Sequence, residues 1–137
     1  ALLKNLQVFD ASRCGKVRGD LAGLASLEHL EELHISAAPK VTGDIACLSA
    51  LAKLRVLNVM YCKEVSGDLA GLAPLRNLEV LRLMHTKVAG NVAGLSVLAK
   101  LRVLDLHACE EVSGDAACLA PLGHLVHLNL RMTKVRG

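Results

Sequence analysis

The 137-residue chain has almost no aromatic side chains: it contains one Phe, one Tyr and no Trp. Its hydrophobic residues, 53% of the total, must therefore build a core mainly from Leu, Val and Ala. Repetition of one small packing layer fills space with such uniform side chains, because each layer contacts only its neighbours. The composition therefore favours a repeat architecture over one compact domain with an irregular core.

Long apolar runs and a strong net charge are also missing. No run approaches the roughly 20 apolar residues that a membrane-spanning helix needs, and the first residues do not have the basic stretch and apolar core of a signal sequence. The net charge is +3, and Lys and Arg alternate with Asp and Glu rather than clustering. We therefore expect neither a membrane nor a nucleic acid as a partner.

Motifs for a metal, a cofactor or catalysis are missing as well. No two cysteines have CxxC spacing, and no His accompanies a Cys at ligand distance in the sequence. His34, His85, His107 and Asp105 can be imagined as an acid–base or metal group, but no nucleophile with a positioned base accompanies them. We expect no metal, no cofactor and no enzymatic activity, and we interpret the histidines as solvated side chains.

What the sequence does contain is one motif in many copies. The stretch from Leu51 to Pro74 reads LAKLRVLNVMYCKEVSGDLAGLAP, and the rest of the chain consists of variants of it. One copy has 23 residues instead of 24, because a residue is missing between Thr86 and Val88. We assign residues 1–137 to a single repeat domain and expect it to be part of a longer array. Five full copies and a partial sixth begin at Leu3, Leu27, Leu51, Leu75, Leu98 and Leu122.

Each copy predicts a strand, a turn and a short helical segment. In the copy that begins at Leu51, a period-two apolar run predicts a short strand, and the Gly of the following CxxVxGD segment indicates a turn. The remainder is too short for more than one or two turns, so we expect an α or 3₁₀ segment there. Helix N-caps are expected just before it at Asp20, Asp44, Asp68, Asn91 and Asp115.

The pattern LxxLxxLxLxxCxxVxGDLAGLAx, which covers the whole chain, resembles that of leucine-rich repeat proteins. The resemblance implies a right-handed α/β solenoid with a parallel sheet on its concave side and short α or 3₁₀ segments on its convex side. The 23-residue copy, with LxxLxLxxTxVxG, is similar to the plant-specific class of repeats. The longer copies, with CxxVSGD, are similar to the cysteine-containing class, so the biology of neither class carries over.

One repeat position directly after the strand is expected to form a structural ladder. In the family it is usually Asn, which faces inward and satisfies backbone groups of the turn; a Thr hydroxyl can do the same, and Cys tolerates burial. Cysteines two copies apart would lie about 10 Å from each other, beyond the disulfide limit of about 7 Å between Cα atoms. We therefore expect core thiols, which favour a reducing compartment. The ladder residues are Cys14, Cys62, Thr86, Cys109 and Thr133, with Ala38 in the second copy.

Residues that alternate with the inward leucines should point out over the concave face. In the middle of this face the sequence places three valines on adjacent strands, with two methionines and a tyrosine beside them. Such an apolar cluster marks an interaction site more often than chance, although Val also simply suits a strand. The predicted partner-binding residues are Val56, Asn58, Met60, Tyr61, Val80, Arg82, Met84, His85, Val103, Asp105, His107 and Arg131.

The resemblance implies non-catalytic recognition of a protein or peptide through the concave sheet. A first alternative is a structural array that stacks end to end through the apolar residues Leu2, Leu3, Leu128 and Leu130. A second alternative is the substrate-receptor part of a ubiquitin ligase, which would need an adjoining F-box segment.

Overall fold

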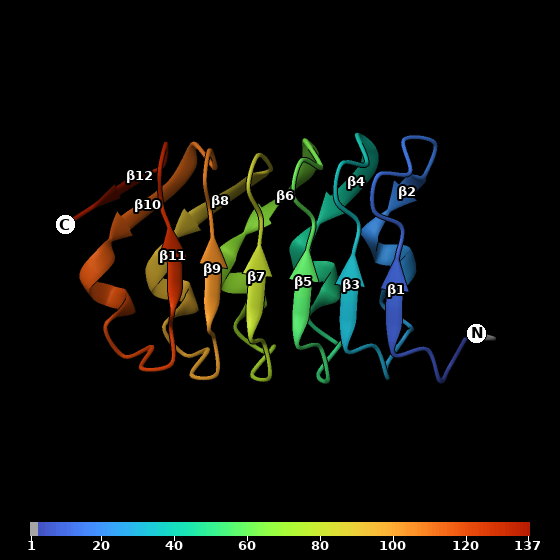
Figure 1. The fold of residues 1–137 in the computed structure, drawn as a ribbon, viewed down its shortest axis with the longest axis horizontal. Helices are drawn as coiled ribbons and strands as arrows, with labels where there is room; N and C mark the ends of the chain where they lie inside the picture. The colour runs from blue at the N-terminus through green and yellow to red at the C-terminus, as the bar shows by residue number, and fades with distance from the viewer. Residues whose placement is uncertain (1–2) are drawn as a thin grey trace.

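The structure, a computed structural model, describes residues 3–137 as a stack of coils with a parallel sheet along one side (Figure 1). Six strands form this sheet, in the order in which they occur along the chain. They confirm the strand predicted for each copy, although each is shorter than its apolar run. We call it the first sheet; its strands are β1 (Val8–Asp10), β3 (Glu32–His34), β5 (Val56–Asn58), β7 (Val80–Arg82), β9 (Val103–Asp105) and β11 (His127–Asn129).

A second parallel sheet follows the first in every coil, and here the sequence prediction was wrong. The segment that ends in Gly-Asp was expected to be a turn, but it is a strand paired with its counterpart in the next copy. In a single copy these backbone groups would lack partners, and stacking of the copies supplies them. The strands of this second sheet are β2 (Arg18–Asp20), β4 (Lys40–Asp44), β6 (Glu64–Asp68), β8 (Lys87–Asn91), β10 (Glu111–Asp115) and β12 (Lys134–Arg136).

Each of the first five coils continues into a 3₁₀ turn, as the N-cap pattern predicted. Asp68 is extended, with φ −85° and ψ 135°, and its Oδ1 accepts a 2.8 Å hydrogen bond from the backbone N of Ala70. Leu69 and Leu72 are both buried, because their spacing of three matches the three residues per turn of a 3₁₀ helix. The five turns are η1 (Leu21–Leu24), η2 (Ile45–Leu48), η3 (Leu69–Leu72), η4 (Val92–Leu95) and η5 (Ala116–Leu119).

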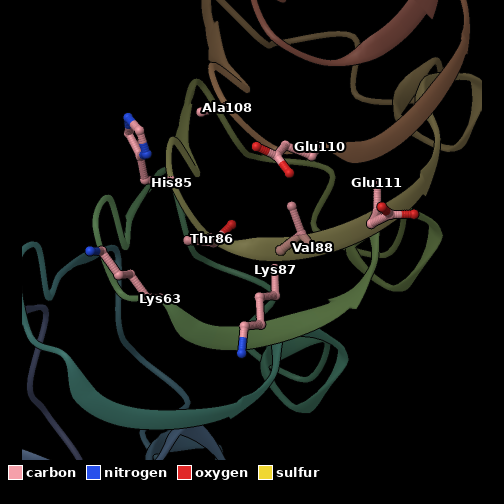
Figure 2. A pocket seen from close by; sticks show the side chains of 8 residues that line it. All are labelled: Lys63, His85, Thr86, Lys87, Val88, Ala108, Glu110 and Glu111. Carbon is pink, nitrogen blue, oxygen red and sulfur yellow. The ribbon is translucent and has the colours of Figure 1, made fainter.

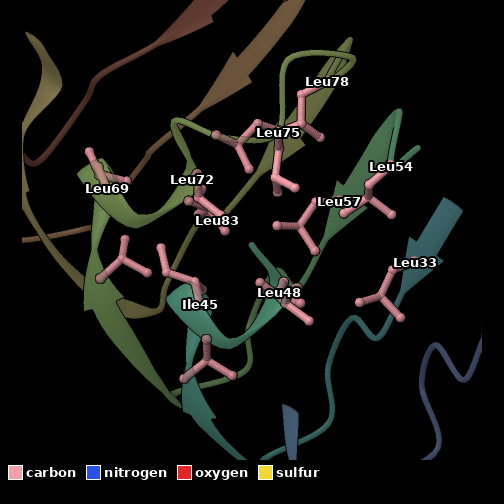
Figure 3. Packing of buried hydrophobic residues seen from close by; sticks show 14 of the residues in the cluster. Leu33, Ile45, Leu48, Leu54, Leu57, Leu69, Leu72, Leu75, Leu78 and Leu83 are labelled. Carbon is pink, nitrogen blue, oxygen red and sulfur yellow. The ribbon is translucent and has the colours of Figure 1, made fainter. Parts of the chain in front are cut away.

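The core is a continuous column of aliphatic side chains between the two sheets and the 3₁₀ turns. Leucines from neighbouring copies, Leu48, Leu57 and Leu72 among them, are directed into this column (Figure 3). Complete burial of one such side chain contributes about 1.5–3 kcal/mol, so the column is the main source of stability. Burial decreases in the end coils, where Leu3 is 58% and Leu128 is 43% exposed; Leu2 lies outside the described residues.

The two sheets stack with different registers. In the first sheet equivalent residues pair directly, as Leu81 does with Leu104. In the second sheet Asp68 pairs with Ala89, which lies two positions before its equivalent Asn91, and the other strand pairs show the same shift. Both registers continue unchanged across the 23-residue copy. The missing residue is therefore lost from the loop that joins β7 to β8.

Gly67 in β6 offers a test of how tightly the coils stack. Its φ is +117°, and a Cβ there would meet the Asp44 carboxylate of the preceding copy and lie 3.0 Å from the backbone N of Ile45. We expect Gly67→Ala to lower the free energy of unfolding by about 2 kcal/mol or more, because the strained backbone and the steric conflict add. Gly23→Ala is the control, because a Cβ at Gly23 would meet no atom within 4 Å. Urea unfolding that gives equal stabilities for both variants would contradict this packing.

Candidate partner-binding surface

The outward side chains of the first sheet form straight rows, because equivalent residues pair directly. Val56, Val80 and Val103 are register partners on β5, β7 and β9. All three are half-buried, since each is flanked by its neighbours at the strand spacing of about 4.8 Å. The valines therefore form a shallow apolar floor rather than a protruding patch.

Three ring side chains border this floor where the strands end. The rings of Tyr61 and His85 stack with their centroids 4.9 Å apart, and His85 meets His107 edge-on at 5.3 Å. Tyr61 is 44% exposed, so its ring and hydroxyl can reach a partner. The sequence did not predict these contacts, because His107 occupies a different repeat position from Tyr61 and His85. The sequence signal for the Tyr61–His85 stack was that both ring side chains occupy the same repeat position in adjacent copies.

Two of the predicted contact residues also hold the backbone. Oδ1 of Asn58 accepts a 3.2 Å hydrogen bond from the backbone N of Met60, and Oδ1 of Asp105 accepts one of 3.0 Å from that of His107. Such Asx turns fix the chain where it leaves the strand. Asp105 is 4% exposed, so little of its carboxylate faces a partner. The recurrence of Asp or Asn at this repeat position was the sequence signal for the Asx turn.

The remaining predicted residues lie on or just beyond the same strands. Arg82 on β7 pairs in register with Asn58 on one side and Asp105 on the other. Met60 and Met84 are half-buried, and Arg131 near the C-terminal end is exposed. The predicted residues therefore follow the first sheet and the segment directly after its strands.

That segment turns through a left-handed residue in every copy. A non-glycine residue costs roughly 1–2 kcal/mol in this conformation, so neighbouring hydrogen bonds must maintain it; the backbone N of Tyr61 donates to O of Met84 at 2.9 Å. The turn interrupts the strand alternation and leaves Tyr61 exposed between half-buried Met60 and buried Cys62. The left-handed residues, with φ between 55° and 62°, are Arg13, Ala37, Tyr61, His85, Ala108 and Met132.

The ladder residues lie beneath this surface. Cys62, Thr86 and Cys109 are buried, and each donates its side-chain hydrogen to a main-chain carbonyl. In the end coils Cys14 is exposed and Thr133 is half-buried. All five cysteines of the chain are free thiols.

The choice between Cys and Thr at the ladder follows the length of the loop. In a 24-residue copy the backbone N of Cys62 donates to the carbonyl of Val59 at 3.2 Å. In the 23-residue copy the carbonyl of Leu83, three residues before Thr86, accepts from the Thr86 hydroxyl at 2.7 Å. The hydroxyl thus stabilises the tighter loop, which a thiol would do less well because it is a weak donor.

Charged side chains precede the strands at the opposite edge of the first sheet. Nε of Arg55 donates to Oε2 of Glu79 at 2.8 Å, and its guanidinium lies 3.9 Å from the Glu31 carboxylate. The hydrogen bond from Arg55 holds the pKa of the Glu79 carboxyl below its usual value. Both side chains face solvent, so the pair adds little stability and acts mainly to favour the observed register.

Within residues 3–137, no three or more His, Cys, Asp or Glu side chains are grouped so that they could hold a metal ion. His34 instead contacts Glu32, with 3.1 Å between Nε2 and Oε1. The described chain also contains no helix of the length and apolar character needed to cross a membrane.

Comparisons with known proteins show the same architecture elsewhere. The plant peptide hormone receptor RGFR1, in complex with RGF2, is 26% identical with a TM-score of 0.76, over 86% of this chain and 19% of the receptor. The ectodomain of the receptor kinase SOBIR1 from Arabidopsis thaliana is 21% identical with a TM-score of 0.71, over 96% of this chain and 70% of that ectodomain. An internalin, InlF from Listeria monocytogenes, is 18% identical with a TM-score of 0.67, over 86% of this chain and 33% of the internalin. Neither a family model nor a curated protein sequence matches the chain.

The two sheets, the 3₁₀ turns and these likenesses define an α/β solenoid with its first sheet on the concave side. The chain has the leucine-rich repeat architecture, which confirms the resemblance and the fold class predicted from the sequence. It spans 19% of the length of RGFR1 and 33% of that of InlF, so the activities of those whole proteins are not assigned to it.

Alkylation of the cysteines tests the ladder. Burial raises the pKa of the Cys62 and Cys109 thiols, so they form less of the reactive thiolate than an exposed thiol does. We expect iodoacetamide at mildly alkaline pH to label exposed Cys14 in the folded protein and to spare Cys62 and Cys109. Guanidinium chloride should make all five cysteines reactive, and mass spectrometry of tryptic peptides measures both conditions. Labelling of Cys62 as fast as Cys14 would show that the ladder is not closed to solvent.

Proposed function

We propose that this chain is a non-catalytic recognition module that binds a protein or a peptide across the outer face of the first sheet. The observation that carries the proposal is the valine floor bordered by the exposed, stacked ring of Tyr61. Tyr and Arg are frequent anchors of binding energy at interfaces, and Met adapts to irregular partner surfaces. RGFR1, a peptide hormone receptor in complex with RGF2, supports a peptide as partner.

The backbone of this surface is already in place before a partner binds. Hydrogen bonds between neighbouring copies hold the segment after each strand, and Asx turns at Asn58 and Asp105 reinforce it. A pre-formed surface loses little conformational entropy on binding, so more of the contact energy contributes to affinity. Catalysis has no part in the proposal, and among the described residues no contact favours the self-stacking array or the ligase receptor over recognition.

Charge placed on the valine floor tests the proposal. Peptides selected from a random displayed library against the wild-type chain serve as probes. We expect Val80→Glu/Met84→Glu to weaken their binding at least about tenfold, because each Glu adds a carboxylate to desolvate. Val97→Glu/Ala99→Glu is the matched control, since it adds the same charge at exposed positions just after η4.

Fluorescence anisotropy measures the affinities, and circular dichroism checks the fold. Tyr61→Ala serves as a second variant if Val80→Glu/Met84→Glu does not fold. Peptides that bind the Tyr61→Ala and wild-type chains equally well, or that lose affinity only for the control, would place recognition elsewhere.

A further inference from the structure

The 23-residue copy leaves a hollow of about 400 Å³ beside the proposed binding surface (Figure 2). Its cause is the unchanged register of both sheets on either side of the shortened copy. The copies before and after carry Lys63 and Glu110 at the loop position that the short copy lacks. The gap therefore separates these two residues. It is lined, among others, by Lys63, His85, Thr86, Val88, Ala108 and Glu110.

Glu110 is the charged group directed into the hollow. Its carboxylate points toward the space above Val88, whereas the charged ends of Lys87 and Glu111 point away (Figure 2). Lys87 is engaged by Glu64 at 3.2 Å, and Glu111 by the ammonium of Lys134 at 3.3 Å. Glu110 has no ion-pair partner among residues 3–137.

Lys63, on the far side of the hollow, does not form an ion pair with Glu110. The two residues belong to copies two layers apart, which corresponds to about 10 Å at the spacing of parallel strands. The ammonium of Lys63 is also directed away from the centre of the hollow (Figure 2). An unpaired carboxylate thus faces a space whose accessible apolar lining includes the half-buried Ala108, with Val88 buried beneath it.

This combination suits a side chain with an apolar stem and a positive head group. Lys and Arg bury their methylene stems along apolar surface while the charge finds a partner, and a guanidinium can form two parallel hydrogen bonds with one carboxylate. His85 belongs both to the hollow and to the ring stack with Tyr61, so the hollow adjoins the proposed binding surface.

We infer that the hollow binds one Lys or Arg side chain of a peptide that lies on the first sheet, with Glu110 as its counter-ion. The inference rests on the proposed function and adds to it that one position of the bound peptide carries a positive charge. The shortened copy thereby acquires a role in specificity, since a 24-residue copy would fill this space.

Small cations test the hollow without any selected peptide. N-acetyl-arginine amide is added to the ¹⁵N-labelled chain, and N-acetyl-citrulline amide, its neutral isostere, is the ligand control. We expect saturable shifts of the backbone amides of Thr86, Ala108 and Glu110 with the arginine compound. Shifts of equal size and saturation with citrulline amide would overturn the inference.

Three variants locate the site. Glu110→Gln should weaken arginine binding about fivefold, as expected for loss of a solvent-accessible ion pair. Glu111→Gln, the control with the same charge change, should leave it within about twofold, because that carboxylate points away. Insertion of one Lys between Thr86 and Lys87, which restores a 24-residue copy, should abolish binding while the circular dichroism stays unchanged.

Two results would overturn the inference at this stage. One is arginine binding that Glu110→Gln leaves unchanged. The other is tighter binding of N-acetyl-glutamate amide that is lost in Lys63→Gln, which would assign the hollow to an anionic group.

The selected peptides separate this inference from the proposed function. If Val80→Glu/Met84→Glu abolishes their binding but Glu110→Gln leaves the Lys- and Arg-containing peptides unaffected, recognition stands and the role of the hollow falls. If Glu110→Gln weakens only the peptides that contain Lys or Arg, both stand. If no peptide depends on the first sheet while arginine amide still depends on Glu110, the proposed function fails and the hollow is a cation site alone.

Discussion

Parallel pairing of equivalent backbone segments spaces successive coils by about 4.8 Å, and the other features of the molecule follow from this spacing. The spacing leaves no room for a Cβ at Gly67, which lies against the N-cap side chain of the preceding copy. It also requires the core side chains of each layer to fit the layers on both sides. Leu and Val meet that requirement in every coil, which explains why the core contains so few aromatic residues.

The same constraint divides each copy between scaffold and surface. Leucines, ladder residues and N-caps are held by contacts that recur from coil to coil, so they cannot vary freely. The outward positions of the first sheet are less restricted, and there the copies differ in charge, size and ring content. Asn58 and Asp105 lie on this surface and also bond the backbone, so part of the apparent variety serves the fold.

Periodicity made the coil predictable, and contacts between copies were harder to predict. The inward leucines, the N-cap at Asp68 and the 3₁₀ segment could be derived from one copy alone. The second sheet could not, because this Gly-containing segment becomes a strand only when the equivalent segment of the next copy lies beside it. The Tyr61–His85–His107 contacts and the hollow above Val88 have the same origin, since each involves side chains from different coils. The missing residue after Thr86 was visible in the sequence, but its effect depended on both sheets keeping their registers.

The direct register of the first sheet also limits how a partner can be matched to it. An extended peptide advances about 3.4 Å per residue, whereas rows on adjacent strands advance about 4.8 Å per copy. In a peptide that crosses the strands, a residue is therefore placed over a strand in the same way again only after about seven residues and five copies. The six strands seen here are separated by five such spacings, so they cover one full repeat of this match. Successive side chains of such a peptide therefore lie at different positions relative to the strands. Identical copies would add no repeated contact for them, whereas copies with different outward residues can define a single alignment of the peptide.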